Sequence, residues 1–296
     1  SVRLRAFAPA KVNLALFVGP TRPDGRHELV TLFQSLSLCD ELFLETLPAP
    51  PDRVECPGVA GETNLAAAAL AELRARGWNG PPVAITITKR IPVAAGMAGG
   101  SADAAATLRL AAMLAPGRPE ELEAVAAGLG ADVPAQLAPG VAIGTGAGEV
   151  VERLPALAPH ALIVVPLPAE LSTPAVYREA DRLGLPRRRE ELGERLAALR
   201  AAARPGARLP GELLVNDLQD AAISLCPAVG QALARVREAG AERAMVSGSG
   251  PTVVGLWWGT DARAAAERAA AGLRPEYPRA LVAVPVEAGA GVPEAV

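Results

Sequence analysis

The chain has 296 residues, half of them apolar, and a formal net charge of −3 at pH 7. This length and apolar content predict a globular protein with one large or two ordinary domains and sizeable cores. The negative net charge does not indicate a basic surface for binding nucleic acid. No stretch reaches the roughly 18 uninterrupted apolar residues that span a bilayer. The widely spaced Cys39, Cys56 and Cys226 match neither a disulfide framework nor a zinc site, which favours a reducing cytoplasm.

Strands and helices are predicted in alternation along the whole chain. In the first half, strands are expected at 3 to 18, with an interruption at 9 to 11, at 31 to 46, at 83 to 88 and on both sides of the glycines at 144 to 148, and helices at 63 to 76, from 101 and at 119 to 128. In the second half, strands are expected near 161 to 166, 243 to 247, 252 to 258 and 280 to 286, and helices near 173 to 184, 190 to 203, 227 to 239 and 261 to 273.

A proline-rich stretch from Leu154 to His160 predicts a boundary between two units. We therefore expect a first domain at 1–157 and a second at 158–288, followed by a loose tail at 289–296 that is small and featureless. The opening apolar run is broken by Lys11 and Asn13, unlike the core of a signal peptide.

The stretch from Pro92 to Leu110, PVAAGMAGGSADAAATLRL, carries the strongest local signal. A glycine-rich turn at 96 to 100 connects a strand to an alanine-rich helical pattern that begins at Ser101. The first amides of a helix have no partners within the helix and lie at the positive end of its dipole, so an anion can bind there, and glycines let it approach. The alternative is an ordinary turn with Ser101 as helix cap. Because the residues from Ala94 to Ala106 are mostly small, we interpret the loop as phosphate-binding.

The signatures of several other nucleotide-binding folds are absent from the sequence. It contains no G-x-x-x-x-G-K-[ST] loop and no H-R-D or D-F-G set of the protein kinases. Residues 144 to 148 superficially resemble a dinucleotide loop, but a strand is predicted after them rather than a helix, which argues against a Rossmann fold.

Two charged residues stand alone among apolar neighbours. Lys11 is the only charge between Arg5 and Arg22, and Asp132 is a single acid in a run of small and apolar residues. Phosphoryl transfer requires positive charge on the phosphates and a group that orients or deprotonates the acceptor hydroxyl, so one lysine and one aspartate suffice. Taken separately, Lys11 could snorkel from a strand edge and Asp132 could cap a helix ahead of Pro134.

Other polar residues are ambiguous on the sequence alone. His27 lies in a turn, and Asn64 and Asn216-Asp217 stand where helix caps are expected. The run from Ser247 to Thr252 is either a plain hairpin turn or a place where small residues let a backbone or a phosphate come close. The triplet Arg187 to Arg189 is expected to be a solvated face.

The order of these motifs is more informative than any one of them. The run from Pro9 to Leu14, the loop PVAAGMAGGSADAAA, the segment LGADVP and the late VSGSGPT together resemble the GHMP kinase superfamily of small-molecule kinases. Further segments are similar to those members that phosphorylate the 2-hydroxyl of a cytidine-diphosphate-linked methylerythritol in the non-mevalonate isoprenoid pathway: residues 23–29, 130–134, 144–149 and 171–177. The resemblance covers nearly the whole chain.

This resemblance implies an α+β protein with the two-domain GHMP kinase fold. The N-terminal domain is expected to be like ribosomal protein S5, with a left-handed βαβ unit that departs from the usual handedness, and the C-terminal domain to be ferredoxin-like, with the active site between them. ATP is the implied phosphoryl donor, with Mg²⁺ bridging its phosphates. The expected partner is the small-molecule substrate, with no nucleic acid or membrane, and the expected state is a cytoplasmic monomer or weak homodimer.

The resemblance also implies roles for individual residues. Asp132 is expected to orient the acceptor hydroxyl and accept its proton, and Lys11 to stabilise charge on the transferring phosphoryl group. Asn64 is expected near the adenine. The phosphate loop that binds ATP comprises Pro92, Val93, Ala94, Ala95, Gly96, Met97, Ala98, Gly99, Gly100, Ser101 and Ala102.

Five positions match the substrate site of the family: Asn13, Arg26, His27, Thr173 and Tyr177. The resemblance implies that His27 reads the cytosine edge and Tyr177 stacks on its face. Arg26 stands where the family commonly has an aromatic residue, so cytosine is expected between a guanidinium group and a ring.

Two features of the phosphate loop follow from its composition. Ala94 and Ala95 replace glycines often found early in the family's loop, which predicts strain at either residue if its φ is positive. Ser101 and Asp103 are candidate contacts of Mg²⁺, directly or through water.

Two alternatives stay open on the sequence. Another GHMP kinase, acting on mevalonate or homoserine, would have no use for the cytosine-reading segments around His27 and Tyr177. A non-catalytic nucleotide-binding regulator would have no reason to retain both Lys11 and Asp132.

Overall fold

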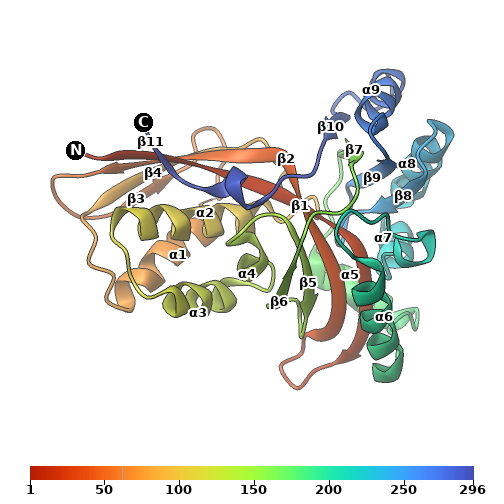
Figure 1. Ribbon diagram of the computed structural model, residues 1–296, viewed down its shortest axis with the longest axis horizontal. Coiled ribbons are helices and arrows are strands. Elements are labelled where there is room, and N and C mark those ends of the chain that lie inside the picture. Colours follow the sequence, from red (N-terminus) through yellow and green to blue (C-terminus); the bar gives the residue numbers. More distant parts are fainter. Residues whose placement is uncertain (62) are drawn as a thin grey trace.

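The computed structural model describes residues 1–61 and 63–296, which form two β-sheets with helices packed against them (Figure 1). The N-terminal sheet comprises β1 (Arg3–Thr21), β2 (His27–Thr46), β3 (Arg53–Glu55), β4 (Val83–Thr88), β5 (Val141–Thr145), β6 (Val150–Leu154) and β11 (Glu294–Ala295). The C-terminal sheet comprises β7 (His160–Val165), β8 (Arg243–Val246), β9 (Val253–Trp258) and β10 (Leu281–Ala283). The expected α+β class is therefore observed.

The N-terminal sheet has the strand order β11-β1-β2-β4-β3, and β5 and β6 continue it from β2. Its β3 and β4 are parallel neighbours joined through helix α1 (Asn64–Ala75), which makes the expected βαβ unit. Helices α2 (Gly99–Leu114), α3 (Pro119–Leu129) and α4 (Val133–Gln136) follow β4. Helix α2 packs against β1, β2 and α1, and so links the phosphate loop to the sheet.

The C-terminal sheet has the order β10-β7-β9-β8, with antiparallel pairs throughout the described strands. Helices α8 (Pro227–Glu238) and α9 (Ala262–Leu273) pack on it. Helix α6 (Arg189–Ala202) packs against β1 and β2. Helices α5 (Thr173–Arg182) and α7 (Gln219–Leu225) pack against each other, and α7 also contacts α8 and β8. Among the described residues, no helix is both long and apolar enough to cross a membrane.

Strand β1 runs without a break through the predicted interruption at 9 to 11 and pairs with β2 over nearly its whole length. The register shifts between Pro9 and Lys11, because proline cannot donate to the ladder and a bulge absorbs the irregularity. From Ala8 to Val18 the strand is buried on both faces. The bulge and this burial place Lys11 and Asn13 inside the molecule.

The main apolar core joins the two sheets. One cluster contains Leu14 and Leu32 of the N-terminal sheet together with Leu162 and Val164 of the C-terminal sheet. A second cluster lies between the C-terminal sheet and helices α8 and α9, and a third lies among the helices that follow β3 and β4. Because one core crosses the join, the sequence-based boundary between 157 and 158 stays a prediction.

The C-terminal segment, expected to be loose, packs along the N-terminal sheet. A short 3₁₀ turn at Ala288–Gly291 precedes β11, which pairs antiparallel with Leu4 and Arg5 of β1. The guanidinium group of Arg109 in α2 donates to the carbonyl oxygens of Phe7 and Gly291. The composition of the tail gave no sign of this because backbone pairing needs no apolar side chains.

Candidate active site

A cavity of about 780 Å³ lies between the two sheets, a size typical of small-molecule sites. It is lined by residues of β1 and β2, the segment 89–101, the residues before α4, helix α5 and the loop after β8. The predicted site residues that line it are Lys11, Asn13, Arg26, His27, Pro92, Val93, Ala94, Ala95, Gly96, Ala98, Gly99, Gly100, Ser101, Asp132, Thr173 and Tyr177. Of the predicted residues, all of which the structure describes, Met97, Ala102 and Asn64 do not line the cavity.

Lys11 and Asp132 meet in this cavity although 120 positions separate them in the sequence. The Lys11 Nζ atom lies 3.7 Å from Asp132 Oδ2. Lys11 is 5 % exposed, so it does not snorkel from an edge. Within the described part of the chain the Asp132 carboxylate makes no capping bond to α4, and 36 % of its side chain is exposed. The pair therefore presents a fixed ammonium beside an accessible carboxylate.

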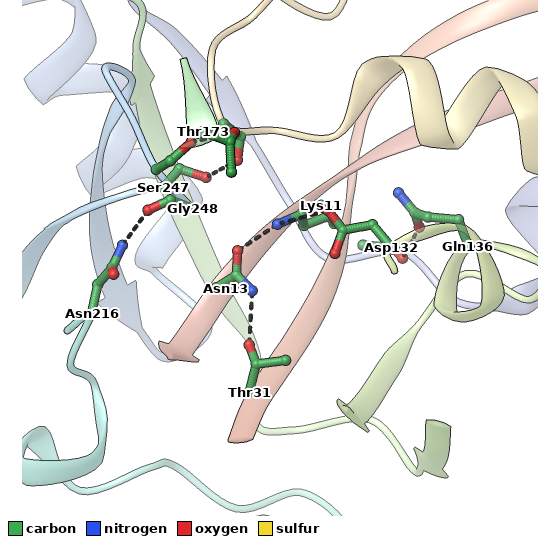
Figure 2. A network of polar contacts seen from close by, with 12 residues as sticks. Lys11, Asn13, Thr31, Asp132, Gln136, Thr173, Asn216, Ser247 and Gly248 are labelled. Atoms are coloured by element: carbon green, nitrogen blue, oxygen red, sulfur yellow. Dashed lines mark hydrogen bonds and ion pairs between the residues drawn. The ribbon is translucent and has the colours of Figure 1, made fainter. Parts of the chain in front are cut away.

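A hydrogen-bonded chain fixes the Lys11 ammonium (Figure 2). Lys11 Nζ donates to Asn13 Oδ1, and Asn13 Nδ2 donates to Thr31 Oγ1 over 2.7 Å. Thr31 in turn donates to the carbonyl oxygen of Ala15, also over 2.7 Å. The ammonium lies 5.5 Å from the centre of the Phe33 ring, where it gains a cation–π contact. Asn13 thus orients Lys11 besides lining the cavity.

The helix after the phosphate loop begins two residues earlier than predicted. Helix α2 starts at Gly99, and its N-cap is Ala98, with a φ of 55° and no side-chain group that could cap. The alternative in which Ser101 caps the helix is therefore wrong; Ser101 lies in the first turn of α2 and lines the cavity. Gly99 and Gly100 line it too, so the start of α2, where free amides are suited to an anion, borders the cavity.

Backbone strain was predicted at Ala94 or Ala95 of the phosphate loop, and it is present at one of them. Ala94 has a φ of 51°, in the left-handed region, whereas Ala95 does not. Ala98 adopts the same region. An L-residue held there costs about 1–2 kcal/mol, so the surroundings must impose this shape.

Those surroundings are backbone contacts from both halves of the chain. The Met97 carbonyl oxygen accepts from the amide of Lys11 over 3.2 Å, and the Ala95 carbonyl oxygen accepts from the amide of Thr252 over 3.3 Å. Ser247 Oγ donates to the carbonyl oxygen of Gly96 over 3.1 Å. The run 247 to 252 thus comes close to the backbone of the phosphate loop. The side chain of Met97 is buried and supports this loop.

Asn64 is the first residue of α1 and is exposed, and it does not line the cavity. Its neighbour Leu65 lines the cavity instead. The role of Asn64 near the adenine stays a prediction.

In the lining of the cavity, His27 packs against α5. His27 Nε2 lies 2.7 Å from Asp181 Oδ1, and the His27 and Tyr177 rings are 4.9 Å apart with a tilt of 34°. Burial of the Tyr177 phenol, together with the charge of Asp132, raises the pKa of its hydroxyl above the usual range. Arg26 lines the cavity, and its guanidinium lies 3.1 Å from Asp24 Oδ2.

A buried charge cluster behind the phosphate loop was missed by sequence reasoning. Lys89 Nζ lies 2.7 Å from Asp40 Oδ2 and 3.0 Å from Asp103 Oδ2. Asp40 Oδ1 accepts from the amides of Arg90 and Ile91, which fixes the chain just before the loop. Burial and the neighbouring Asp40 raise the pKa of Asp103 to about 8, against the opposing pull of Lys89. The signals available were a carboxylate in a largely apolar strand, Asp40, and a lysine at a strand end, Lys89.

This cluster changes the expectation for a metal contact. Asp103 is fully buried and is not among the described residues that line the cavity, whereas Ser101 is. No group of three His, Cys, Asp or Glu side chains in the described ranges is arranged to hold a metal ion. The contact through Asp103 is therefore not supported.

Comparison with known proteins identifies the family. The family model described as GHMP kinases N terminal domain matches residues 64–140, and that described as GHMP kinases C terminal matches residues 186–274. A 4-diphosphocytidyl-2-C-methyl-D-erythritol kinase of Streptomyces coelicolor is 46% identical over 267 residues, covering 88% of each chain. The enzyme of that name from Saccharopolyspora erythraea is 46% identical over 279 residues, covering 90% of this chain and 87% of the relative.

Solved structures agree. A crystal structure of 4-(cytidine 5'-diphospho)-2C-methyl-D-erythritol kinase superposes with a TM-score of 0.72 at 35% identity, covering 95% of this chain and 98% of that one. A homoserine kinase from Cytophaga hutchinsonii has a TM-score of 0.69 at 17% identity, covering 100% and 98%, and shows the fold alone. The expected GHMP kinase fold is confirmed. The chain belongs to the GHMP kinases, in the family of the 4-diphosphocytidyl-2-C-methyl-D-erythritol kinases.

Proposed function

We propose that this chain is a kinase that transfers the γ-phosphoryl group of ATP to the 2-hydroxyl of 4-diphosphocytidyl-2-C-methyl-D-erythritol, in the non-mevalonate isoprenoid pathway. The observation that carries the proposal is the Lys11–Asp132 pair, 3.7 Å apart in a cavity bordered by the first turn of α2. The relatives with 46% identity support the choice of substrate. We further propose that it works in the cytoplasm as a monomer or weak homodimer.

In the proposed reaction, Asp132 orients the 2-hydroxyl group and accepts its proton. The 2-oxygen forms a bond to the γ-phosphorus while the bond between that phosphorus and the β,γ-bridging oxygen breaks, and ADP leaves. The Lys11 ammonium stabilises the charge on the transferring group. The amides of Gly99 and Gly100 at the start of α2 hold the phosphates, since they lie at the positive end of the helix dipole.

Magnesium would arrive with ATP as part of the nucleotide substrate and neutralise phosphate charge. Mg²⁺ usually binds proteins through one or two hard oxygen ligands and keeps phosphates and water as the others. The Ser101 hydroxyl is an oxygen ligand in the lining of the cavity. It fits such an ion, and we propose it as a protein contact in place of Asp103.

The remaining predicted residues are assigned to the cytidylated substrate. Tyr177 of α5 and His27 lie together and present a ring pair suited to a flat base. Arg26 would have to leave Asp24 to cover the other face of the base. Asn13 and Thr173 line the same cavity.

The test is ATP consumption by the purified protein over a panel of acceptors: cytidylated methylerythritol, mevalonate, homoserine and galactose. We expect turnover with the first alone and a phosphate on its 2-hydroxyl by phosphorus NMR. Turnover with mevalonate or homoserine would favour another GHMP kinase activity. Silence on every acceptor, with ATP still bound, would favour a regulator.

A further inference from the structure

Asn216 is a buried amide that lies behind the active-site cavity. It is 6 % exposed, and its Nδ2 donates to the carbonyl oxygens of Val246 over 2.9 Å and Gly248 over 2.7 Å (Figure 2). Its Oδ1 accepts from the amide of Leu218 over 2.9 Å. Both N–H donors of the amide are therefore used on one loop. The expectation of a helix cap accounts only for the bond to Leu218.

Asn216 does not reach the substrate. It is absent from the described lining of the active-site cavity and lines a second cavity of about 560 Å³ instead. Gly248, which accepts its shorter hydrogen bond, does line the active-site cavity. Asn216 therefore reaches the cavity indirectly, through Gly248 or through Leu218, which also lines it.

The loop that Asn216 holds is packed against the phosphate loop. A Cβ atom added to Gly248 would come within 2.7 Å of the Gly96 carbonyl oxygen, so the two backbones touch. Ser247 Oγ donates to that same oxygen. On the far side, Ser249 Oγ lies 2.9 Å from Thr173 Oγ1. A displaced loop would thus shift both Gly96 and the start of α5.

The segment around Asn216 is also tied to the strand that carries Lys11. The amide of Leu16 donates to the carbonyl oxygen of Val215 over 2.8 Å, and the carbonyl oxygen of Leu16 accepts from the amide of Asp217 over 2.9 Å. Asp217 Oδ2 accepts from the amide of Val18 over 3.0 Å. Because Leu16 lies five residues beyond Lys11 on a buried strand, this bonding fixes Asn216 relative to the catalytic ammonium.

These contacts close a ring around the cavity. From Lys11 the first link follows β1 to Leu16, whose backbone bonds the segment around Asn216. Asn216 bonds Gly248, and Gly248 touches Gly96 of the phosphate loop. The bond between the Met97 carbonyl oxygen and the Lys11 amide completes the ring. Asn216 is the one side chain in this sequence of links; the others are backbone contacts.

We propose that Asn216 is a positioning residue for phosphoryl transfer: by holding the loop at Gly248 against Gly96, it sets the amides at the start of α2 relative to Lys11. The proposal rests on the proposed kinase function. Two carbonyl oxygens converge on its nitrogen, so only a side chain with two donors at this point satisfies both. A misplacement of about 1 Å between reacting groups can cost about 100-fold in rate.

The test is Asn216→Asp, which keeps the acceptor for Leu218 and the shape of the side chain but replaces both donors with an oxygen that repels the two carbonyls. We expect weaker ATP binding in the absence of acceptor substrate, and a fall in kcat of at least about tenfold. The KM of the cytidylated substrate should change less than the affinity for ATP, because Asn216 bonds Gly248, which touches Gly96, whereas Thr173 of α5 is reached one link further on, through Ser249.

The matched control is Gln219→Leu. Gln219 Oε1 accepts from the amide of Val246 over 3.1 Å. This variant therefore removes a hydrogen bond from Val246, to which Asn216 also bonds, and leaves the bond to Gly248 in place. A purely structural role predicts that both variants lose activity only in proportion to their loss of thermal stability. That result, or an unchanged kcat and ATP affinity in Asn216→Asp, overturns the proposal.

A second variant and the ATP affinity of the wild type distinguish a failure to fold, a failure of the proposed function and a failure of the positioning role. If Asn216→Asp does not fold, Asn216→Ser, which retains one donor, is measured by the same criteria. A wild-type protein that binds ATP but phosphorylates none of the acceptors refutes the proposed function, whereas the ATP affinities of the variants still decide whether Asn216 positions the loop.

Discussion

A Cβ atom added to Gly96 would lie 2.1 Å from the carbonyl oxygen of Ser247. These residues belong to two motifs, the phosphate loop and the run 247 to 252, which come from opposite halves of the chain. Their contact is possible only because Gly96 has no side chain, and its φ of 84° also favours glycine. The two motifs therefore form one structural unit beside the cavity.

Replacing Gly96 with alanine should break this unit. The left-handed φ costs alanine about 1–2 kcal/mol, and the Cβ must also push one backbone away from the other. We expect Gly96→Ala to lower the free energy of unfolding by more than about 2 kcal/mol and to weaken ATP binding. Chemical denaturation and calorimetric titration with ATP measure the two effects.

The control for this variant is Gly77→Ala at the end of α1. Gly77 has a φ of 92°, and no described atom lies within 4 Å of a Cβ added to it. It therefore reports the cost of the backbone conformation alone, about 1 kcal/mol, with ATP binding unchanged. Equal effects from both variants would contradict the close-packing argument.

Removing the negative charge of Asp132 should abolish most of the chemistry without affecting the fold. Its carboxylate lies 3.7 Å from the Lys11 ammonium and is half-exposed. A positioned general base contributes about 10²–10⁴-fold in rate, so Asp132→Asn should lower kcat by at least about 100-fold. Steady-state kinetics and thermal melting measure this.

Asp261→Asn is the matched control for Asp132→Asn, because Asp261 also stands before a helix, α9, outside the described cavity lining. It should leave kcat unchanged. Turnover of Asp132→Asn near the wild-type rate would show that another group accepts the proton.

Tyr177 is predicted to act on substrate affinity rather than on the rate of transfer. Its ring lines the cavity beside His27. Stacking of a base on an aromatic ring contributes about 1–3 kcal/mol, so Tyr177→Ala should raise the KM of the cytidylated substrate by at least about fivefold. Tyr177→Phe keeps the ring and should have little effect. An unchanged KM in Tyr177→Ala would remove the stacking assignment.

The sequence predicted the longer helices and the strands they alternate with, because caps, prolines and glycines mark their ends. It gave no bounds for α4 and α7, although helix caps were considered at Asp132 and at Asn216-Asp217, because these helices have four and seven residues and carry too few apolar positions for a periodic signal. The extra length of β2, which begins at His27, was also missed because its first residues resemble a turn. Local patterns are weakest where tertiary contacts decide the conformation.

The same limit applies to the site. Lys11 and Asp132 were noticed as isolated charges, but only the resemblance to a family joined them, since nothing local places residue 11 beside residue 132. The cluster of Lys89, Asp40 and Asp103 escaped because the partners come from β2, the end of β4 and α2. Arg187, expected to be solvated, in fact binds Asp217 over 2.7 Å, a pairing that spacing cannot show.

Asp181 is predicted to orient His27 for substrate recognition. Its Oδ1 lies 2.7 Å from His27 Nε2, so neutral His27 carries its proton on Nε2 and leaves Nδ1 as an acceptor. A hydrogen bond to a charged group contributes about 1.5–3 kcal/mol. Asp181→Ala should therefore raise the KM of the cytidylated substrate about tenfold with kcat unchanged.

Asp181→Asn is the control for this prediction, because its amide oxygen can still accept from His27 Nε2. It should raise the KM less than Asp181→Ala does. A fall in kcat in both variants, with an unaltered KM, would instead place His27 in the transfer step.

The raised pKa of Asp103 predicts a pH-dependent stability that can be measured without substrate. The pKa of its carboxyl group is 3.8 in the unfolded chain and about 8 in the fold, because burial and Asp40 outweigh Lys89. Between these values the folded state holds a proton that the unfolded chain has released. The contribution of Asp103 to stability is therefore complete below about pH 4 and is lost as the pH rises toward about 8.

Asp103→Asn replaces this carboxyl group with a neutral isostere and removes the titration. The free energy of unfolding of the wild type, relative to this variant, should decrease as the pH rises from 5 to 8, by at most about 1.4 kcal/mol per pH unit. Denaturant unfolding at several pH values measures it, with Asp220→Asn, an exposed acid at the start of α7, as the control. A difference that stays constant, or grows in favour of the wild type with rising pH, would mean that Asp103 is ionised beside Lys89 throughout.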